Sequence, residues 1–151
     1  DICIRTTVIV GFPGETEEDF NELCEYIAQT EFDRLGAFTY SREEDTPAYD
    51  FENQIDEQTK QDRYDIIMRE QLHIAERKNQ AFVGKRMTVL CEAYDSVAEI
   101  YYGRSAYDAP DIDTKVYFRN ALGKKRIAPG AFVEVDIEEA VDYDLIGRAV
   151  V

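Results

Sequence analysis

The stretch Ile4–Phe20 reads IRTTVIVGFPGETEEDF and changes from apolar to acidic near its middle. Its first part, Ile4–Val10, is apolar and rich in β-branched residues, which predicts a buried strand. Gly11–Gly14 ends that strand, because two glycines and a proline interrupt regular structure. Thr16 is a typical helix N-cap, and the acidic residues after it suit the positive end of a helix. The stretch therefore predicts a strand, a tight turn and a helix.

The following sequence repeats this order. Apolar residues at helical spacing continue the first helix (Phe20, Leu23, Cys24, Ile27). Leu35–Tyr40 predicts a second strand, Ser41–Asn53 a polar loop, and 56–79 a long helix with an apolar stripe (Tyr64, Ile67, Met68, Leu72, Ala75). Strand–helix–strand–helix order predicts parallel strands joined by right-handed crossovers. Two strands alone cannot cover both faces and both edges of a parallel sheet. We therefore expect a piece of a longer protein, with further strands before Asp1, or self-association of the open edge.

The sequence after residue 81 has a different pattern, with short alternating strands and no helix. Five strands are predicted: Arg86–Ala93, Glu99–Arg104, Lys115–Phe118, Phe132–Glu138 and Leu145–Val151. Five short strands in about 70 residues are typical of a small closed barrel of OB-like size. The expected fold class is α/β plus all-β, with one domain over residues 1–81 and another over 82–151.

The charge of the chain restricts its partners. The chain has 17 Lys+Arg against 32 Asp+Glu, a formal net charge of -15. Residues 1–81 hold 8 basic and 20 acidic side chains (-12), and residues 82–151 hold 9 and 12 (-3). Such a field opposes binding to phosphates and so argues against nucleic acid. It leaves a basic partner open, and also the simpler reading that the charge keeps the protein dissolved.

The cysteines and the apolar residues suggest a cellular compartment. Cys3, Cys24 and Cys91 are odd in number and widely spaced, which fits neither a disulfide framework nor a zinc site. No apolar run has the length of a membrane span, which is about 18 residues or more. The sequence therefore predicts a cytoplasmic protein with no membrane partner.

Two segments are candidates for binding. The turn at Gly11–Thr16 could let a ligand approach the backbone closely. Acidic residues crowd it, however, and it matches neither a GxGxxG nor a P-loop pattern, so a plain tight turn is the alternative. Gly103–Asp113 mixes Arg, Tyr, Ser and Asp between two strands, as either a binding loop or a long capped turn. The single histidine, His73, has no partner in its helix and is interpreted as structural.

The motifs in both parts resemble those of the radical-SAM methylthiotransferases. Ile4–Phe20 is similar to a motif late in the barrel of that family, and Phe38–Ala48 resembles its final strand and loop. Asp45 stands where the family usually has glycine, and Asp tolerates the left-handed conformation that such a turn needs. The β-rich part resembles the TRAM domain of the family. The resemblance implies the C-terminal part of a radical-SAM α/β (TIM-like) partial barrel followed by the TRAM barrel.

Three further segments resemble the RimO type within that family: Gly103–Ser105, Asp108–Asp113 and Asp142–Gly147. That type attaches a methylthio group to the β-carbon of an aspartate in a small-subunit ribosomal protein. The resemblance implies S-adenosylmethionine and two 4Fe-4S clusters as cofactors, and a basic ribosomal protein as partner. The cysteine motif that holds the radical-SAM cluster is absent from this chain, so we expect the chain alone to be inactive. The alternatives are a MiaB-type enzyme, which modifies adenosine in tRNA, and a non-catalytic TRAM-containing binding module.

The resemblance also implies site residues by position. Ligands of such barrels lie at the carboxyl ends of the strands, which assigns a cofactor-binding role to Gly11, Phe12, Pro13, Gly14, Glu15, Tyr40 and Arg42. For contact with the protein substrate the assigned residues are Arg104, Tyr107 and Asp108. No catalytic residue and no metal ligand is expected in this chain.

Overall fold

The computed structural model describes residues 2–121, 123 and 126–150. The chain packs as two units, Asp1–Ile74 and Ala75–Val151, and the division falls within one long helix. Each unit is described separately below. Among the described residues, no helix is both long and apolar enough to cross a membrane.

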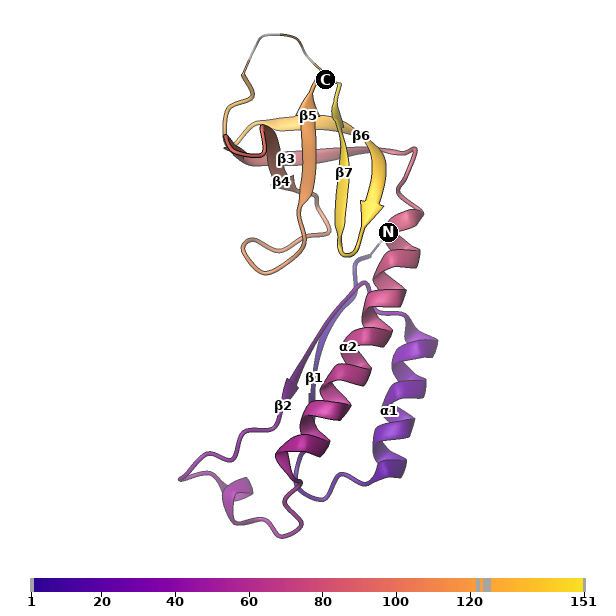
Figure 1. Cartoon of the computed structure of the whole chain (residues 1–151), viewed down its shortest axis with the longest axis vertical. Coiled ribbons are helices and arrows are strands. Elements are labelled where there is room, and N and C mark those ends of the chain that lie inside the picture. Colours follow the sequence, from indigo (N-terminus) through magenta and orange to yellow (C-terminus); the bar gives the residue numbers. More distant parts are fainter. Residues whose placement is uncertain (1, 122, 124–125, 151) are drawn as a thin grey trace. The chain divides into compact units, whose positions relative to one another are not determined.

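The first unit has the expected order of strands and helices (Figure 1). Its elements are β1 (Arg5–Val10), α1 (Glu17–Thr30), β2 (Arg34–Thr39), a 3₁₀ helix (Pro47–Asp50) and the first part of α2 (Glu57–Gln80). The strands β1 and β2 pair in parallel, in register from Arg5 opposite Arg34 to Val10 opposite Thr39. The expectation of parallel strands joined through a helix is thus confirmed.

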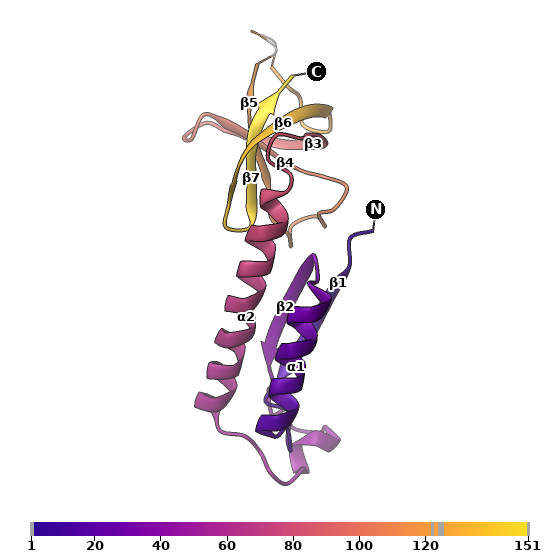
Figure 2. The same ribbon diagram turned by 90° about the vertical axis from the view of Figure 1, so that its right-hand side faces the viewer.

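The helices cover one face of this sheet, where the core of the unit lies (Figure 2). Buried apolar residues from both strands, from α1 and from α2 form that core: Val10, Phe20, Ile27, Phe32, Leu35, Ala37, Ile67 and Ile74. On the strands, the side chains that alternate with the core residues point away from it. Ile9 and Phe38, which are opposite each other in the register, are 57% and 63% exposed. The face of the sheet that points away from the core therefore also carries exposed apolar side chains.

The buried face of α2 differs from the expected apolar stripe. Ile67 and Ala75 are buried as expected, but Leu72 is only half-buried. Four polar side chains of α2 are buried instead: Lys60, Arg63, Gln71 and Asn79. Helical periodicity places charged residues on the solvent side, and at these positions tertiary contacts override it.

The second unit contains a closed barrel with the strand order β3-β4-β5-β7-β6 (Figure 1). The strands are β3 (Arg86–Asp95), β4 (Ile100–Arg104), β5 (Val116–Asn120), β6 (Phe132–Val141) and β7 (Asp144–Ala149). All neighbours are antiparallel except β5 and β7, which pair in parallel. The expected small β-barrel is confirmed. The end of the last predicted strand, Val151, lies outside the described residues.

Two glycines let the barrel strands approach closely. A Cβ atom on Gly103 would collide with the carbonyl oxygen of Leu90, and one on Gly147 would collide with that of Asp136. Inward side chains alternate along each strand and fill the interior (Val89, Cys91, Tyr101, Val116, Phe118, Val133, Val135, Ile137, Leu145, Ala149). Glycine at these two positions is therefore required by packing.

Several local details differ from the expectation. The loop Ser41–Asn53 contains the 3₁₀ helix, which begins at Pro47, a favourable first position for a helix. Strand β4 begins at Ile100 and not at Glu99, because Glu99 has a φ of 53° and ends the preceding turn. Asp45 has a φ of 63°, which confirms that this residue adopts the left-handed conformation.

Candidate functional site

The turn between β1 and α1 is held by hydrogen bonds at both ends. Gly11 and Gly14 have φ values of 75° and 87°, a backbone conformation that residues with a side chain rarely adopt. The Glu15 amide donates to the carbonyl of Phe12 at 2.9 Å. Thr16 caps α1 as expected: the Asp19 amide donates to Thr16 Oγ1 at 3.1 Å, and the Thr16 amide donates to the Asp19 carboxylate at 2.8 Å. This capping box fixes where the helix begins.

Glu15 folds back onto the turn. Its carboxylate accepts a hydrogen bond from the Gly11 amide and forms an ion pair with Arg63, whose Nη1 lies 3.1 Å away. Arg63 Nη1 also donates to the Glu15 carbonyl at 3.3 Å. The side chains of Arg63 and Glu15 are only 11% and 13% exposed. Of the acidic residues near this helix terminus, Glu15 is thus occupied by the turn itself and is not a free surface charge.

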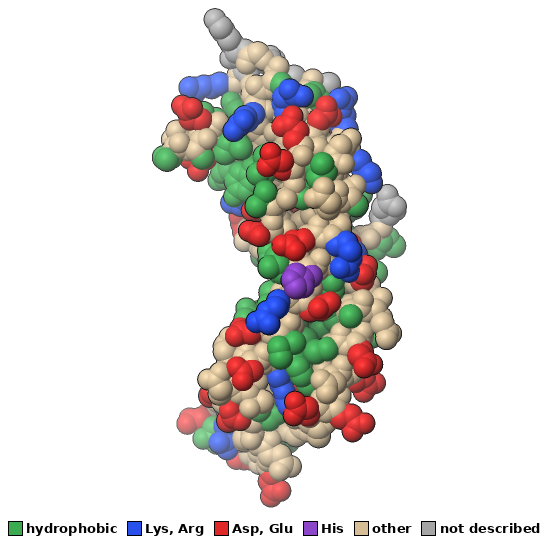
Figure 3. All heavy atoms as spheres, turned by 45° about the vertical axis from the view of Figure 1, so that its right-hand side comes forward, with side chains coloured by type: hydrophobic (Ala, Val, Ile, Leu, Met, Phe, Trp, Pro, Cys, Tyr) green, Lys and Arg blue, Asp and Glu red, His purple; other side chains and the backbone are tan. Residues whose placement is uncertain are grey.

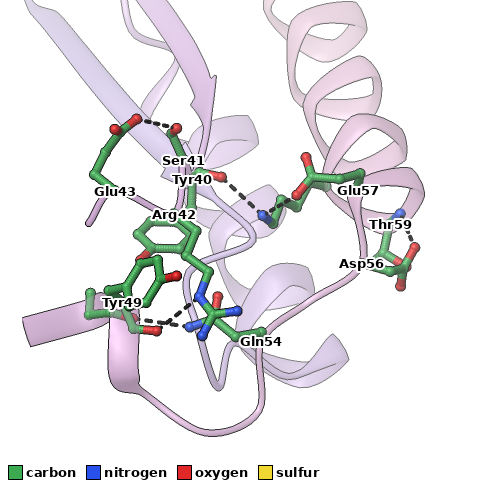
Figure 4. Close-up of polar contacts among 11 residues, drawn as sticks. Tyr40, Ser41, Arg42, Glu43, Tyr49, Gln54, Asp56, Glu57 and Thr59 are labelled. Carbon is green, nitrogen blue, oxygen red and sulfur yellow. Dashed lines mark hydrogen bonds and ion pairs between the residues drawn. The ribbon is translucent and has the colours of Figure 1, made fainter. Parts of the chain in front are cut away.

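The end of β2 is tied to α2 by Lys60. The Lys60 ammonium donates to the carbonyl of Tyr40 at 3.1 Å and forms an ion pair with Glu57 at 2.7 Å (Figure 4). The Lys60 side chain is 3% exposed, and its carbon chain occupies the space that a Cβ atom on Gly11 would need. The Tyr40 amide donates to the Val10 carbonyl at 2.9 Å. Lys60 therefore contacts both strand ends.

Aromatic rings lie beside the same turn. Phe12 packs edge-on against Tyr40, with ring centroids 5.2 Å apart, and against Phe51, 6.1 Å apart. Phe12 and Phe51 are 43% and 47% exposed. The Tyr40 hydroxyl is buried and has no hydrogen-bond partner among the described residues. The structure thus brings Gly11–Glu15 and Tyr40 together, as the assignment by position requires.

Arg42 makes its contacts within its own loop. Its Nε donates to the carbonyl of Tyr49 at 2.9 Å, and its guanidinium lies 4.4 Å from the centroid of the Tyr49 ring (Figure 4). Gln54 closes the same loop by donating to the carbonyls of Ala48 and Phe51, each at 3.0 Å. The segment that follows β2 is therefore ordered by its own side chains.

The second candidate segment, in the barrel, is also built from internal contacts. Arg104 Nε donates to Glu92 across the strands at 2.9 Å. The Asp108 carboxylate accepts from the Ser105 amide at 3.0 Å and from the Ser105 hydroxyl at 2.6 Å, and Asp108 is buried. The Tyr107 ring packs against Phe82 with centroids 5.8 Å apart. Of the three assigned residues, Asp108 is thus the one whose side chain faces the loop and not the surface.

The three cysteines lie in different parts of the chain, and the pKa values of two of the thiols are raised. Burial raises the pKa of the Cys24 thiol, and the charges of Glu70 and Glu15 add to the effect. Burial also raises the pKa of the Cys91 thiol. A thiol with a raised pKa is a poor thiolate ligand at neutral pH. Within residues 2–121, 123 and 126–150, no three His, Cys, Asp or Glu side chains are grouped so that they could hold a metal ion.

Comparison with known proteins identifies both units. The family model of the TRAM domain matches residues 83–150. A protein of Acetivibrio thermocellus named ribosomal protein uS12 methylthiotransferase RimO is 47% identical over 150 residues, which cover 99% of this chain and 32% of the relative. Proteins of the same name from Clostridioides difficile (46% over 148 residues; 97% of this chain, 32% of the relative) and from a Psychrobacter species (47% over 147; 96% and 28%) also match.

The chain belongs to the RimO family. It spans about a third of the length of the curated relatives it matches. The expected resemblance is confirmed in both parts of the chain, because the matches include residues 1–81 as well as the TRAM domain.

Two side chains that order the turn, Lys60 and Arg63, were not predicted from the sequence. Both lie in a helix whose average character is polar, and their charge alone does not separate them from the exposed charges beside them. One signal was present in the sequence. Both residues lie on the same helical face as Ile67 and Ile74, because the successive spacings are three, four and seven residues.

Proposed function

We propose that this chain is part of a RimO-type enzyme that methylthiolates the β-carbon of an aspartate in a small-subunit ribosomal protein. In this proposal residues 1–81 are part of the radical-SAM barrel and residues 82–151 are the TRAM domain. The observation that carries it is the identity of 42–47% over nearly the whole chain to proteins named ribosomal protein uS12 methylthiotransferase. Identity at this level across both units is stronger support for a shared function than similarity of fold alone would be.

S-adenosylmethionine is the proposed ligand of the turn region, which consists of Gly11, Phe12, Pro13, Gly14, Glu15, Tyr40 and Arg42. When bound, it supplies the methyl group and the adenosyl group for the reaction. Two observations support the fit: Phe12 and Phe51 present half-exposed rings suited to an adenine, and the buried Tyr40 hydroxyl still lacks a partner among the described residues. The chain's own contribution is to bind and orient the ligand at the strand ends.

The iron–sulfur clusters that RimO-type chemistry needs do not fit this chain. Cys3 precedes β1, Cys24 lies in α1, and Cys91 is buried in the barrel of the other unit. A 4Fe-4S cluster needs four ligands that converge on one point. In the proposed enzyme the clusters are therefore held by residues outside this chain.

The TRAM domain is the proposed docking surface for the ribosomal protein. Arg104 and Tyr107 are its proposed contacts, and Asp108 supports them by holding the loop through Ser105. The charge of the first unit supports a basic partner, because acidic side chains are spread over much of the visible surface (Figure 3). Complementary charge of this kind accelerates encounter and disfavours wrong partners.

A tRNA-modifying function is the second candidate, because one face of the barrel favours it. Tyr102 and Tyr117 are cross-strand neighbours in β4 and β5, and alternate with inward residues. The Lys115 ammonium lies 4.2 Å from the Tyr102 ring centroid, and Arg119 is exposed nearby on β5. Aromatic and basic side chains on a small barrel are typical contacts to single-stranded nucleic acid.

A segment exchange tests the proposed function. The matching third of the Acetivibrio thermocellus relative is replaced by this chain, and the product is assayed with S-adenosylmethionine, a reductant and uS12. We expect methylthiolated uS12, detected by mass spectrometry of its peptides. The relative without this segment and the 151-residue chain alone are the controls, and both should give no product. Methylthiolation by the chain alone, or modified tRNA in place of modified uS12, would refute the proposal.

A further inference from the structure

Two buried cations lie one turn apart on α2, at Lys60 and Arg63. Their side chains are 3% and 11% exposed, whereas most charged residues of the helix are exposed. Taking an ammonium or a guanidinium out of water is costly unless it is fully paired and hydrogen-bonded. A stability argument alone therefore does not explain why these two positions are cationic.

The contacts of Lys60 are poor compensation for burial. Its carboxylate partner, Glu57, is 85% exposed, so water screens most of their attraction. Its second hydrogen bond goes to the neutral carbonyl of Tyr40, and the ammonium lies 5.3 Å from the Tyr40 ring centroid. Replacing a buried ion by an apolar side chain of similar volume is often neutral or stabilising. Methionine at position 60 would keep the packing against Gly11 and remove the hydrogen bond to Tyr40 together with the screened ion pair to Glu57.

The contacts of Arg63 converge on the turn. The guanidinium binds both the carbonyl and the carboxylate of Glu15, and that carboxylate also accepts the Gly11 amide. The guanidinium carbon also lies over the ring of Phe20, 5.3 Å from its centroid, in the first turns of α1. Arg63 therefore fixes the two ends of the segment Gly11–Glu15 relative to each other.

We infer that Lys60 and Arg63 are positioning residues for the ligand of the strand ends: Lys60 sets the end of β2 at Tyr40, and Arg63 sets the turn at Gly11–Glu15. The inference rests on the proposed function, in which these two segments bind S-adenosylmethionine. Both cations are too deeply buried to bind the ligand themselves, so they act through the backbone that they hold. Binding groups that are already held in the bound geometry raise affinity, because the protein loses less conformational entropy when the ligand binds.

The test separates ligand positioning from stability. Lys60→Met and Arg63→Met are made in the complete enzyme that the proposed function describes, and S-adenosylmethionine binding is measured by calorimetry. We expect each variant to bind about tenfold or more weakly, since small misplacements of binding groups can cost up to about a hundredfold. We expect the unfolding midpoint of the Lys60→Met enzyme to stay equal or rise. The control is Arg69→Met, an exposed cation on the same helix, which should change neither quantity.

A second measurement reports the backbone directly. In the 151-residue chain, amide hydrogen exchange followed by NMR should be faster at Gly11 in Arg63→Met than in the unsubstituted chain, because the acceptor carboxylate loses its anchor. The NMR chemical shift of the Tyr40 carbonyl carbon should change in Lys60→Met, because that oxygen loses the hydrogen bond from the ammonium. These readouts remain decisive if either variant enzyme is too unstable for calorimetry, and an unchanged Gly11 amide and Tyr40 carbonyl would then overturn the inference.

The outcomes distinguish this inference from the proposed function. Failure of the unsubstituted enzyme to bind S-adenosylmethionine would overturn the proposed function, and this inference with it. Normal binding that survives both substitutions would overturn this inference alone. Weaker binding in proportion to a loss of folded protein would also overturn it, because the cations would then only stabilise the fold.

Discussion

A Cβ atom on Gly11 would collide with Cγ of Lys60, so the glycine in the turn and the lysine in α2 fit together as a pair. Gly11 also has a φ of 75°. We expect Gly11→Ala to destabilise the first unit by about 2–5 kcal/mol, the sum of a left-handed backbone penalty and an overpacking penalty. Urea unfolding of the chain, followed by NMR signals of residues in the first unit, measures this loss.

The matched control is Gly14→Ala in the same turn. Gly14 has a φ of 87°, but nothing lies within 4 Å of an added Cβ, so only the backbone penalty of about 1–2 kcal/mol applies. In a Lys60→Ala background the cost of Gly11→Ala should fall toward that of Gly14→Ala. Equal costs of Gly11→Ala with and without Lys60 would contradict the steric account.

Much of the first unit could be predicted from the sequence because strong local signals agree there. Apolar and β-branched residues define β1, the two glycines define its end, and Thr16 defines the start of α1. The role of Glu15 could not be predicted, because its carboxylate serves Gly11 nearby in sequence and Arg63 far from it. Helical periodicity can place Arg63 on the buried face of α2, but it does not say which carboxylate pairs with it, so the ion pair was visible only in three dimensions.

Gly103→Ala should unfold the barrel or severely weaken it. The added Cβ would meet the backbone of Leu90, which cannot move without disrupting the pairing of β3 and β4. We expect a loss of about 3 kcal/mol or more, at the upper end of overpacking costs. Thermal unfolding followed by NMR signals of Val89 and Phe118 reports on this unit.

For comparison, Gly36→Ala in β2 adds a Cβ with nothing within 4 Å and no positive φ. That substitution should be neutral, or stabilise by up to about 1 kcal/mol by restricting the unfolded chain. A barrel that tolerates alanine at position 103 as well as the sheet does at position 36 would contradict the close approach of β3 and β4.

Asp108→Ala should loosen the loop after β4. The carboxylate accepts two hydrogen bonds from Ser105, and bonds to a charged acceptor contribute about 1.5–3 kcal/mol. We therefore expect a loss of that order in the stability of the barrel and faster amide exchange at Ser105. Asp111→Asn is the control, because Asp111 is exposed and Asn tolerates its φ of 62°. An unchanged Ser105 amide in Asp108→Ala would argue that the loop is held by other contacts.

The same observation explains why the role of Asp108 could not be predicted from composition. A Ser and an Asp three residues apart suit either a surface that binds a partner or a turn that binds itself. Only the burial of Asp108 separates the two. The parallel pairing of β5 with β7 was equally hidden, because five alternating strands are compatible with several barrel topologies.

Acid should weaken the start of α1 through Asp19. Hydrogen bonds from the side chain and backbone of Thr16 hold the pKa of Asp19 below its ordinary value. Because the folded pKa is the lower one, the stabilisation is present above the unfolded pKa, roughly 3.9, and is lost as the pH falls through the folded pKa. Urea midpoints of the first unit between neutral pH and about pH 2 should therefore fall less in Asp19→Asn than in the unsubstituted chain. Parallel curves would show that Asp19 makes no such contribution.

Salt dependence should separate the two candidate partners. An acidic first unit facing a basic ribosomal protein predicts binding that weakens as the salt concentration rises, whereas phosphate contacts predict a steep loss of tRNA affinity between about 50 and 200 mM salt. We expect measurable, salt-sensitive binding of uS12 and no tRNA binding by the chain. Lys115→Glu, which changes the charge beside Tyr102, should leave uS12 binding unchanged or strengthen it. Tight tRNA binding that Lys115→Glu abolishes would instead assign the aromatic and basic face of the barrel to nucleic acid. In that case Lys115 would be a cation that pairs with the phosphates of the RNA.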